Sequence, residues 1–312
     1  MKTTANRRSL RNPFISRVVQ TLDDGHQLVF LSRRQRKRLR PFHLTPNHLN
    51  AHVITPRPQQ PHTAWLRLWA PQSLAWWIAL LFLIGSACFA YGGFAANWPE
   101  LLKPDMATTP VIGVVFFVGS LFFTSAAGLQ LLEAINGDIA DLGTGPSGQR
   151  RAWHWWAWKP HNAGYLSSLI QFAGTLLFNF NTGDALLAGL GWVEKDVLIW
   201  TPDMIGSLCF LAASYLALME ISHGWWSFEP RQVAWWVVMI NLAGSIAFQV
   251  SAFYAFFPPP PDVSWSWIWD ANLWTFIGAL CFFVASYLMI PELFDADSGK
   301  TVVLSPHERL SA

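Results

Sequence analysis

The sequence predicts an all-α, polytopic membrane protein with six transmembrane helices arranged as three hairpin repeats. Charged residues make up only 13% of the 312-residue chain, and hydrophobic residues make up 52%, whereas soluble proteins carry about 25% charged residues. Apolar stretches of about 20 residues, enough to cross a ~30 Å hydrocarbon core, occur repeatedly. A pattern of glycine, phenylalanine and glutamate recurs within them. This composition excludes a soluble enzyme, a disordered chain and a nucleic-acid-binding globule.

The apolar stretches divide the chain into three parts. We expect a basic N-terminal segment with a Pro-rich linker at 1–70, a membrane domain at 71–294 and a C-terminal tail at 295–312. Asn181 and Asp184 suggest that the third span ends early or is kinked. The six spans are expected at 74–96, 110–133, 164–187, 203–223, 233–257 and 271–292, which gives hairpins at about 74–133, 164–223 and 233–292.

The basic residues predict the orientation of the chain in the membrane. Of the 21 Lys and Arg residues, 13 lie in the first 70 residues. With the N-terminus in the cytoplasm, only Lys103 and Lys195 fall in outer loops, as the positive-inside rule requires. Many of the 19 Trp residues cluster at the span ends, which is typical of interfacial anchoring. We therefore expect a multi-pass protein of the bacterial inner membrane with both termini in the cytoplasm.

The even spans carry one repeated pattern, and the odd spans carry a related one. In the even spans a glycine precedes a phenylalanine by four residues and a glutamate by 14 residues. These positions are Gly119, Phe123 and Glu133; Gly206, Phe210 and Glu220; and Gly278, Phe282 and Glu292. In the odd spans the glycine and phenylalanine recur as Gly85 and Phe89, Gly174 and Phe178, and Gly244 and Phe248.

These hairpins are parallel repeats, because every one enters the membrane from the same side. If the three copies pack equivalently, they form a pseudo-threefold bundle. The alternative is an open chain of hairpins.

Two short segments of the first hairpin carry a resemblance to a known family. Residues 81–89 read LFLIGSACF and residues 114–123 read VVFFVGSLFF. These segments resemble the YrhK-like family of small bacterial membrane proteins, built on hairpins with Gly-Ser-x-x-Phe helices. The resemblance covers residues 74–292. It implies a hairpin architecture and supplies no catalytic residues.

The three repeated glutamates are the first candidate site. On an even span the glycine and the glutamate share one helix face, so Glu133, Glu220 and Glu292 face neighbouring helices. A carboxylate at the negative end of its own helix needs compensation. The glutamates either face the N-terminus of an adjacent odd helix or pair with Arg67, Arg150, Arg151, Lys159 or Arg231. Alternatively, they form a carboxylate ring at the inner mouth of a cation or proton pathway, or are simply exposed at the interface.

His223 and four amides extend this candidate site. Glu220 and His223 have the Glu-x-x-His spacing of carboxylate metal sites in helical bundles, but the motif occurs once where two are needed. No metal site is therefore expected, and His223 is a candidate pH-sensitive partner of Glu220. The amides Gln171, Asn179, Asn241 and Gln249 lie inside odd spans. They either form interhelical hydrogen bonds or line a polar cavity with Asn181, Ser214, Tyr215, Ser286 and Tyr287.

The N-terminal segment is strongly basic. We expect a β-hairpin from 18–22 and 27–31 around an Asp-Asp-Gly turn. The next eight residues contain six basic ones: Arg33, Arg34, Arg36, Lys37, Arg38 and Arg40. Binding to anionic lipid headgroups is the first interpretation of this run, and nucleic acid is the runner-up.

Two function classes follow. The first is a channel or transporter for a small cation or proton, with the glutamates at the inner end and His223 and the amides along the path. The second is a non-transporting scaffold that holds anionic lipid or a partner through the basic segment. An enzyme is not expected, and neither is a cofactor. A hydrated cavity reaching the glutamates would favour transport, whereas a dry centre packed with the six repeated phenylalanines would favour the scaffold.

Overall fold

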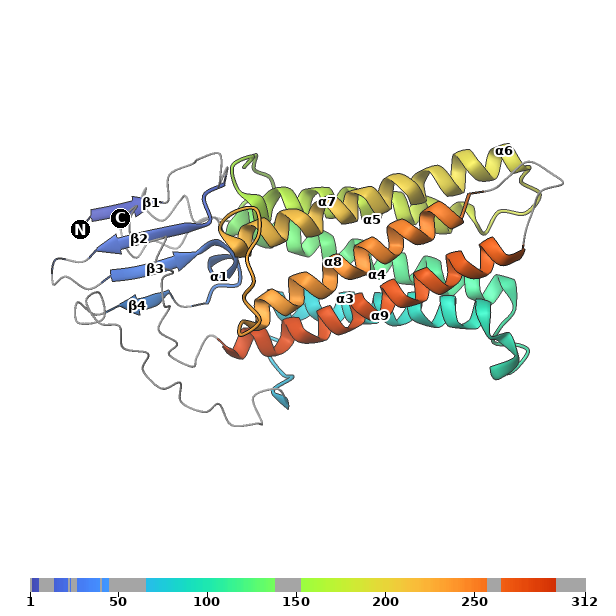
Figure 1. Cartoon of the computed structure of the whole chain (residues 1–312), viewed down its shortest axis with the longest axis horizontal. Coiled ribbons are helices and arrows are strands. Elements are labelled where there is room, and N and C mark those ends of the chain that lie inside the picture. Colours follow the sequence, from blue (N-terminus) through green and yellow to red (C-terminus); the bar gives the residue numbers. More distant parts are fainter. Residues whose placement is uncertain are drawn as a thin grey trace.

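The computed structural model describes residues 2–5, 14–21, 23, 27–39, 41–44, 66–137, 153–256 and 265–295. Long helices running side by side make up most of this part (Figure 1). They are α3 (Leu74–Asn97), α4 (Thr109–Asn136), α5 (Ala163–Asp184), α7 (Thr201–Ser222), α8 (Val233–Tyr254) and α9 (Trp265–Asp295). Predictions for Arg40, Arg150, Arg151 and the tail beyond 295 lie outside the described residues.

Five of these helices are long and apolar enough to cross a membrane, as the sequence predicts for a multi-pass membrane protein. The remaining one is α5, whose hydropathy is lowered by polar residues such as Gln171, Asn179 and Asn181. Large apolar side chains including Val114, Leu176 and Leu208 are exposed on the outside of the bundle. An apolar exterior of this kind is suited to lipid contact.

The predicted span boundaries differ most from the helices at the starts of the fourth and sixth spans, since α9 begins at Trp265 instead of residue 271, and the third span ends three residues earlier than predicted. Helix α5 ends at Asp184, consistent with the early end that Asn181 and Asp184 suggest. The fourth helix starts well before residue 203, because α6 (Trp192–Lys195) and the π-helical turn η4 (Asp196–Trp200) lead into α7. The resulting helical run covers Trp192–Ser222.

The helices form a closed ring. Each long helix contacts the next one along the chain, and α9 contacts α3, so the described helices do not form an open chain of hairpins. Within each hairpin two of the repeated glycines face each other. A Cβ added to Gly85 would lie 3.1 Å from the carbonyl oxygen of Gly119, and one added to Gly244 would lie 3.0 Å from that of Gly278. Glycine therefore permits the close helix contacts expected from a small-residue stripe.

The N-terminal segment adds a β-sheet to the helical membrane domain. Strands β1 (Lys2–Ala5), β2 (Arg17–Thr21), β3 (Gln27–Leu31) and β4 (Phe42–Leu44) form an antiparallel sheet in that order. The predicted hairpin is confirmed, since β2 pairs with β3. The short helix α1 (Ser32–Arg36) follows β3 and contacts α4 and α7. The sheet thus lies at one end of the bundle (Figure 1), which we call the sheet end; the opposite end is the far end.

Candidate functional site

The interior of the helical ring is closed at mid-height by six phenylalanine side chains. We call this set the phenylalanine layer: Phe89, Phe123, Phe178, Phe210, Phe248 and Phe282, one from each long helix. None of these residues is more than 5% exposed. Helical spacing accounts for the layer, because in every helix the phenylalanine stands four residues after the glycine that brings the helix pair together.

The rings of the phenylalanine layer form two stacked triangles. Phe89, Phe178 and Phe248 come from the odd spans, and their ring centroids are 5.8–6.4 Å apart. The other three come from the even spans and are separated by 5.8–6.2 Å. Contacts of 5.0–5.4 Å join the two triangles within each hairpin. All of these pairs except the tilted Phe89–Phe248 pair meet edge to face, which is attractive at these distances, so the rings pack directly against one another at the centre of the described ring.

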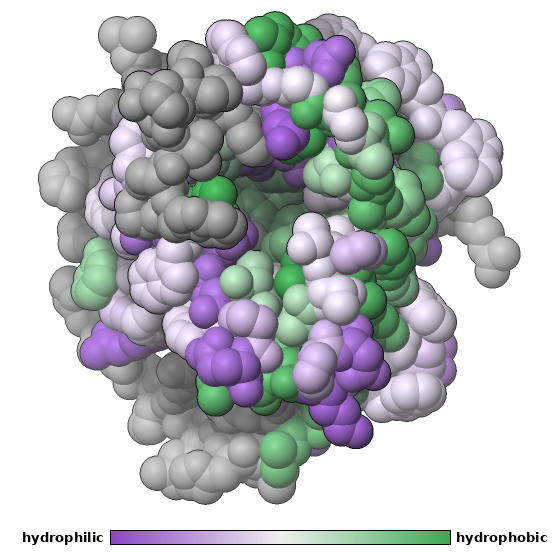
Figure 2. Space-filling view, turned by 90° about the vertical axis from the view of Figure 1, so that its right-hand side faces the viewer, coloured by the Kyte–Doolittle hydropathy of each residue, from purple (hydrophilic) through white to green (hydrophobic). Residues whose placement is uncertain are grey.

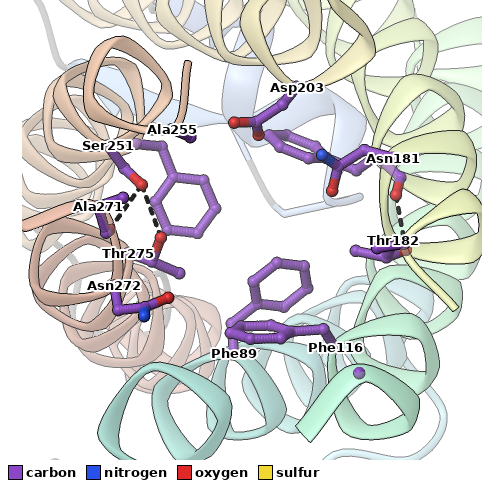
Figure 3. Close-up of a pocket in the computed structure, with 14 residues that line it drawn as sticks. Phe89, Phe116, Asn181, Thr182, Asp203, Ser251, Ala255, Ala271, Asn272 and Thr275 are labelled. Atoms are coloured by element: carbon purple, nitrogen blue, oxygen red, sulfur yellow. Dashed lines mark hydrogen bonds between the residues drawn. The ribbon is translucent and has the colours of Figure 1, made fainter. Parts of the chain in front are cut away.

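A cavity of about 160 Å³, lined by both apolar and polar side chains, lies on the far side of the phenylalanine layer. We call it the far cavity. It is seen as a hollow at the centre of the far end in Figure 2. Its floor includes Phe89, Phe178 and Phe248, and its polar lining consists of Asn181, Thr182, Asp203, Ser251, Asn272 and Thr275 (Figure 3).

A smaller cavity of about 50 Å³ lies between the phenylalanine layer and the sheet end. It is lined by Gln130, Gln171, Asn241 and Ser286, and its sheet-end boundary includes Arg33. Two cavities with mixed polar and apolar linings are therefore separated by an apolar layer, and the smaller one is bounded by a side chain from the N-terminal segment.

The predicted amide path is only partly assembled around these cavities. Gln171 and Asn241 line the sheet-end cavity. Gln171 accepts a 3.4 Å hydrogen bond from Gln130, and Asn241 donates a 2.8 Å hydrogen bond to Ser214. Asn179 and Gln249 line neither cavity, and each keeps a buried carbonyl oxygen without a partner. Interhelical bonding and cavity lining thus both occur, in different members of the set.

The repeated glutamates lie at the sheet end and are all buried, with Glu133 7%, Glu220 2% and Glu292 7% exposed. Glu292 receives two hydrogen bonds from Arg33, of 2.7 and 2.9 Å, and one of 2.6 Å from Lys37. The paired contacts of Arg33 have the bidentate geometry that makes arginine–carboxylate pairs strong.

Glu220 is held by α1 and by the start of α5. Ser32 donates a 2.6 Å hydrogen bond to one carboxylate oxygen, and Arg36 donates a 2.5 Å hydrogen bond to the other. A Cβ added to Gly164, the second residue of α5, would lie 2.5 Å from the Glu220 carboxylate and 2.8 Å from the Arg36 guanidinium. This position combines both compensations expected from the sequence, namely an adjacent helix N-terminus and a cation.

Glu133 has no ion pair within 4 Å among the described residues, but the charges of Arg36, Lys37 and Arg33 act on it. Gly137 follows its helix, and a Cβ there would lie 2.5 Å from the Cα of Arg36. The missing side chain at Gly137 therefore leaves room for the backbone of α1. His223 has a left-handed φ of 49°, and its Nδ1 lies 2.7 Å from the Oγ of Ser16.

The basic run therefore lies differently from the lipid-facing arrangement expected for it. Arg33, Arg36 and Lys37 point into the helical domain and bind two of the repeated glutamates. They come from an element far away in the sequence, and none is among the partners that the sequence suggested for the glutamates. Arg34 is half-buried, and Arg38 is exposed. The buried carboxylates explain the difference, because they bind these cations in an environment with little water.

Two of these cations respond differently to burial. Burial alone would lower the pKa of Arg33, but the Glu292 carboxylate reverses the effect, and the pKa is raised. For Lys37, burial lowers the pKa from 10.5 to about 8; nearby Arg33 adds to the decrease, while Glu292 and Glu133 oppose it. Arg33 thus keeps its charge at every pH of interest, whereas Lys37 titrates near pH 8.

Docking of the N-terminal segment should therefore strengthen as the pH rises from 7 to 9. Between pH 8 and pH 10.5 an undocked Lys37 holds more protons than a docked one, and raising the pH favours the state with fewer protons. We expect the docking equilibrium constant to increase about tenfold between pH 7 and pH 9. Hydrogen exchange of the β3 and α1 amides, corrected for intrinsic rates, measures it. Lys37→Met should abolish this pH dependence of docking, and the control Lys103→Met should retain it. Docking that weakened above pH 8 would contradict the lowered pKa of Lys37 as its cause.

Sequence reasoning missed Asp203 and Ser32 as site residues. The sequence places Asp203 at the first residue of the expected fourth span, 203–223, whereas the structure places it inside the helical run Trp192–Ser222 and in the lining of the far cavity. Asp203 stands three residues, about one helical turn, before Gly206. This spacing places it on the same helix face as the glycine, which is the one signal in the sequence that could have identified it. Ser32 had no such signal, because its partner Glu220 is 188 residues away.

Comparison with known proteins does not assign this site. No family model, curated protein or solved structure matches the chain.

Proposed function

We propose that the ring of helices is a gated pathway for small cations in the bacterial inner membrane. In this proposal α5 crosses the bilayer together with the five more apolar helices, and the sheet end faces the cytoplasm, where the basic residues concentrate. The three hairpins are then YrhK-like repeats around a pseudo-threefold axis. The near-equal ring separations within each phenylalanine triangle support this arrangement.

One observation carries the proposal: two cavities with polar groups in their linings lie on either side of a layer made only of phenylalanine. Unpaired polar groups inside a membrane are costly, so a purely structural ring has no reason to keep cavities lined by amides, hydroxyls and a carboxylate. An apolar constriction between hydrated cavities is a known way to gate conduction by dewetting. The structure then corresponds to a closed state.

The glutamates have a different role in this proposal from the ring of charges expected at an inner mouth. Arg33, Arg36 and Lys37 form ion pairs with Glu220 and Glu292, so these two glutamates anchor the N-terminal segment across the pathway. We refer to this anchored segment, residues 32–37, as the plug. Two barriers in series, the phenylalanine layer and the plug, close the path.

A second candidate function is a non-transporting scaffold. The observation that favours it is the packed centre, because six buried phenylalanine rings hold the helices together without a continuous path. In that case anionic lipid or a protein partner is held by the basic residues of the N-terminal segment.

Flux into proteoliposomes separates the two functions. We expect wild-type protein to pass little Na⁺, K⁺ or H⁺, and a variant carrying Glu292→Gln and Phe248→Gln to pass at least ten times more. Glutamine at 248 keeps most of the side-chain volume while introducing an amide that hydrates the layer, and Glu292→Gln loosens the plug. The matched control combines Glu292→Gln with Phe180→Gln, since Phe180 is 62% exposed on the outside of the ring. Equal flux from the two variants would overturn the pathway and leave the scaffold.

A further inference from the structure

We propose that the far cavity contains a binding site for one monovalent metal cation, with Asp203 as the charged ligand. The inference deepens the proposed function and rests on it for the place of the site in a pathway. The binding itself is argued from the cavity and does not require transport.

Asp203 carries a carboxylate that no described residue compensates. Asp203 is partly buried, and no hydrogen bond or ion pair within the described part of the chain reaches its oxygens. Figure 3 shows the carboxylate pointing from α7 into the far cavity. Glu220 and Glu292 differ from Asp203 in this respect, because both are bound by cationic side chains. A carboxylate within a membrane-spanning stretch is costly unless something binds it.

The position of Asp203 on its helix does not explain its charge. Although α7 begins at Thr201, the backbone N–H of Thr201 already donates to the carbonyl of Asp196, and the helical run starts at Trp192. Asp203 is therefore about three turns inside the run. The partial positive charge of a helix N-terminus falls off within the first turn, so Asp203 is not a capping residue.

The remaining polar lining consists of neutral groups that carry oxygen. Asn181 donates its amide N–H to the carbonyl of Ile199, 2.9 Å away in the π-helical turn, which leaves its own carbonyl oxygen without a described partner. Asn272 and Thr275 lie across the cavity from Asn181 (Figure 3). Ser251 and Thr275 share a 2.7 Å hydrogen bond. Carboxylate, carbonyl and hydroxyl oxygens together are the donors that hard cations prefer.

The charge and size of the site select a monovalent cation. Asp203 is the only carboxylate among the residues described as lining the cavity, and no cluster of three His, Cys, Asp or Glu residues occurs within the described ranges. One negative charge balances one Na⁺ or K⁺, whereas a divalent ion usually draws on several carboxylates. A cavity of about 160 Å³ also leaves room for waters that complete the coordination.

Equilibrium binding to the full-length protein in detergent tests the site. Radioactive ²²Na⁺ is titrated in choline chloride, with unlabelled K⁺ as competitor, and the melting temperature is followed over the same Na⁺ range. We expect saturable binding with about one ion per chain, and at least tenfold weaker binding in Asp203→Asn. Asp105→Asn, the same change at an exposed far-end position, should bind like the wild type. Thr275→Val removes a neutral oxygen and should weaken binding less, which keeps the test valid if Asp203→Asn fails to fold.

Each result decides the inference. Absence of saturable binding, or equal binding in the wild type and in Asp203→Asn, overturns it. Stabilisation by acid alone, lost in Asp203→Asn and insensitive to Na⁺ and K⁺, also overturns it and makes the group a proton site. Saturable binding without flux in the Phe248→Gln, Glu292→Gln variant would support the cation site and contradict the pathway. Flux without saturable binding would support the pathway and contradict the cation site.

Discussion

Glu292→Gln is expected to release the plug from the helical domain. The change leaves the guanidinium of Arg33 and the ammonium of Lys37 buried without the carboxylate that accepts their three hydrogen bonds. Removing one partner of a buried ion pair costs about 3–5 kcal/mol, which corresponds to a loss of more than a hundredfold in the docking equilibrium. Hydrogen exchange of the α1 and β3 amides should accelerate by that factor.

The control for this prediction is Glu100→Gln, because Glu100 is exposed at the far end. Replacing Arg33, Lys37 and Glu292 together with methionine should cost less than Glu292→Gln alone, since no uncompensated charge then stays buried. Exchange in Glu292→Gln within a factor of two of the wild type would show that the ion pairs do not hold the segment.

Phe210→Ala is expected to lower the free energy of unfolding of the membrane domain by about 3–5 kcal/mol. Phe210 is 1% exposed and contacts the rings of Phe123, Phe178 and Phe282 at 5.1–6.2 Å. Truncation leaves a void at the point where the helices meet, and the lining atoms lose their packing partners. Unfolding in a mixed-detergent titration measures the loss.

Phe180→Ala provides the comparison. This substitution removes a ring of the same size from the outer surface of α5, where no void forms. We expect a change below about 1 kcal/mol there. Similar losses for Phe210→Ala and Phe180→Ala would contradict the central role of the phenylalanine layer.

The sequence was sufficient to predict those features that depend on local spacing. The positions of the five apolar helices follow from hydropathy, and the hairpin of β2 and β3 follows from alternating residues around a turn. Repeated glycines and phenylalanines at a fixed spacing indicated which helix faces meet. The dry centre that the sequence left as an alternative is where those phenylalanines lie.

The features that the sequence did not predict depend on contacts between distant segments. The need to compensate Glu220 and Glu292 was evident, but the cations considered lay next to the spans, whereas Arg36 and Arg33 are 184 and 259 residues away. No local pattern encodes such a pairing. Asp203 is missed for a local reason, since the apolar stretch begins at that residue and gives no sign of the helical turns that precede it.

The pairing between Arg33 and Glu292 also has a consequence for the order of events during synthesis. The basic residues leave the ribosome first, whereas the carboxylate that they bind belongs to the last helix, 259 residues later. Domains generally form from the N-terminus during synthesis, but this segment has to wait until the third hairpin is inserted. Its docking therefore reports that all the helices are in place, and a truncated chain that lacks α9 leaves Arg33 and Lys37 without their carboxylate.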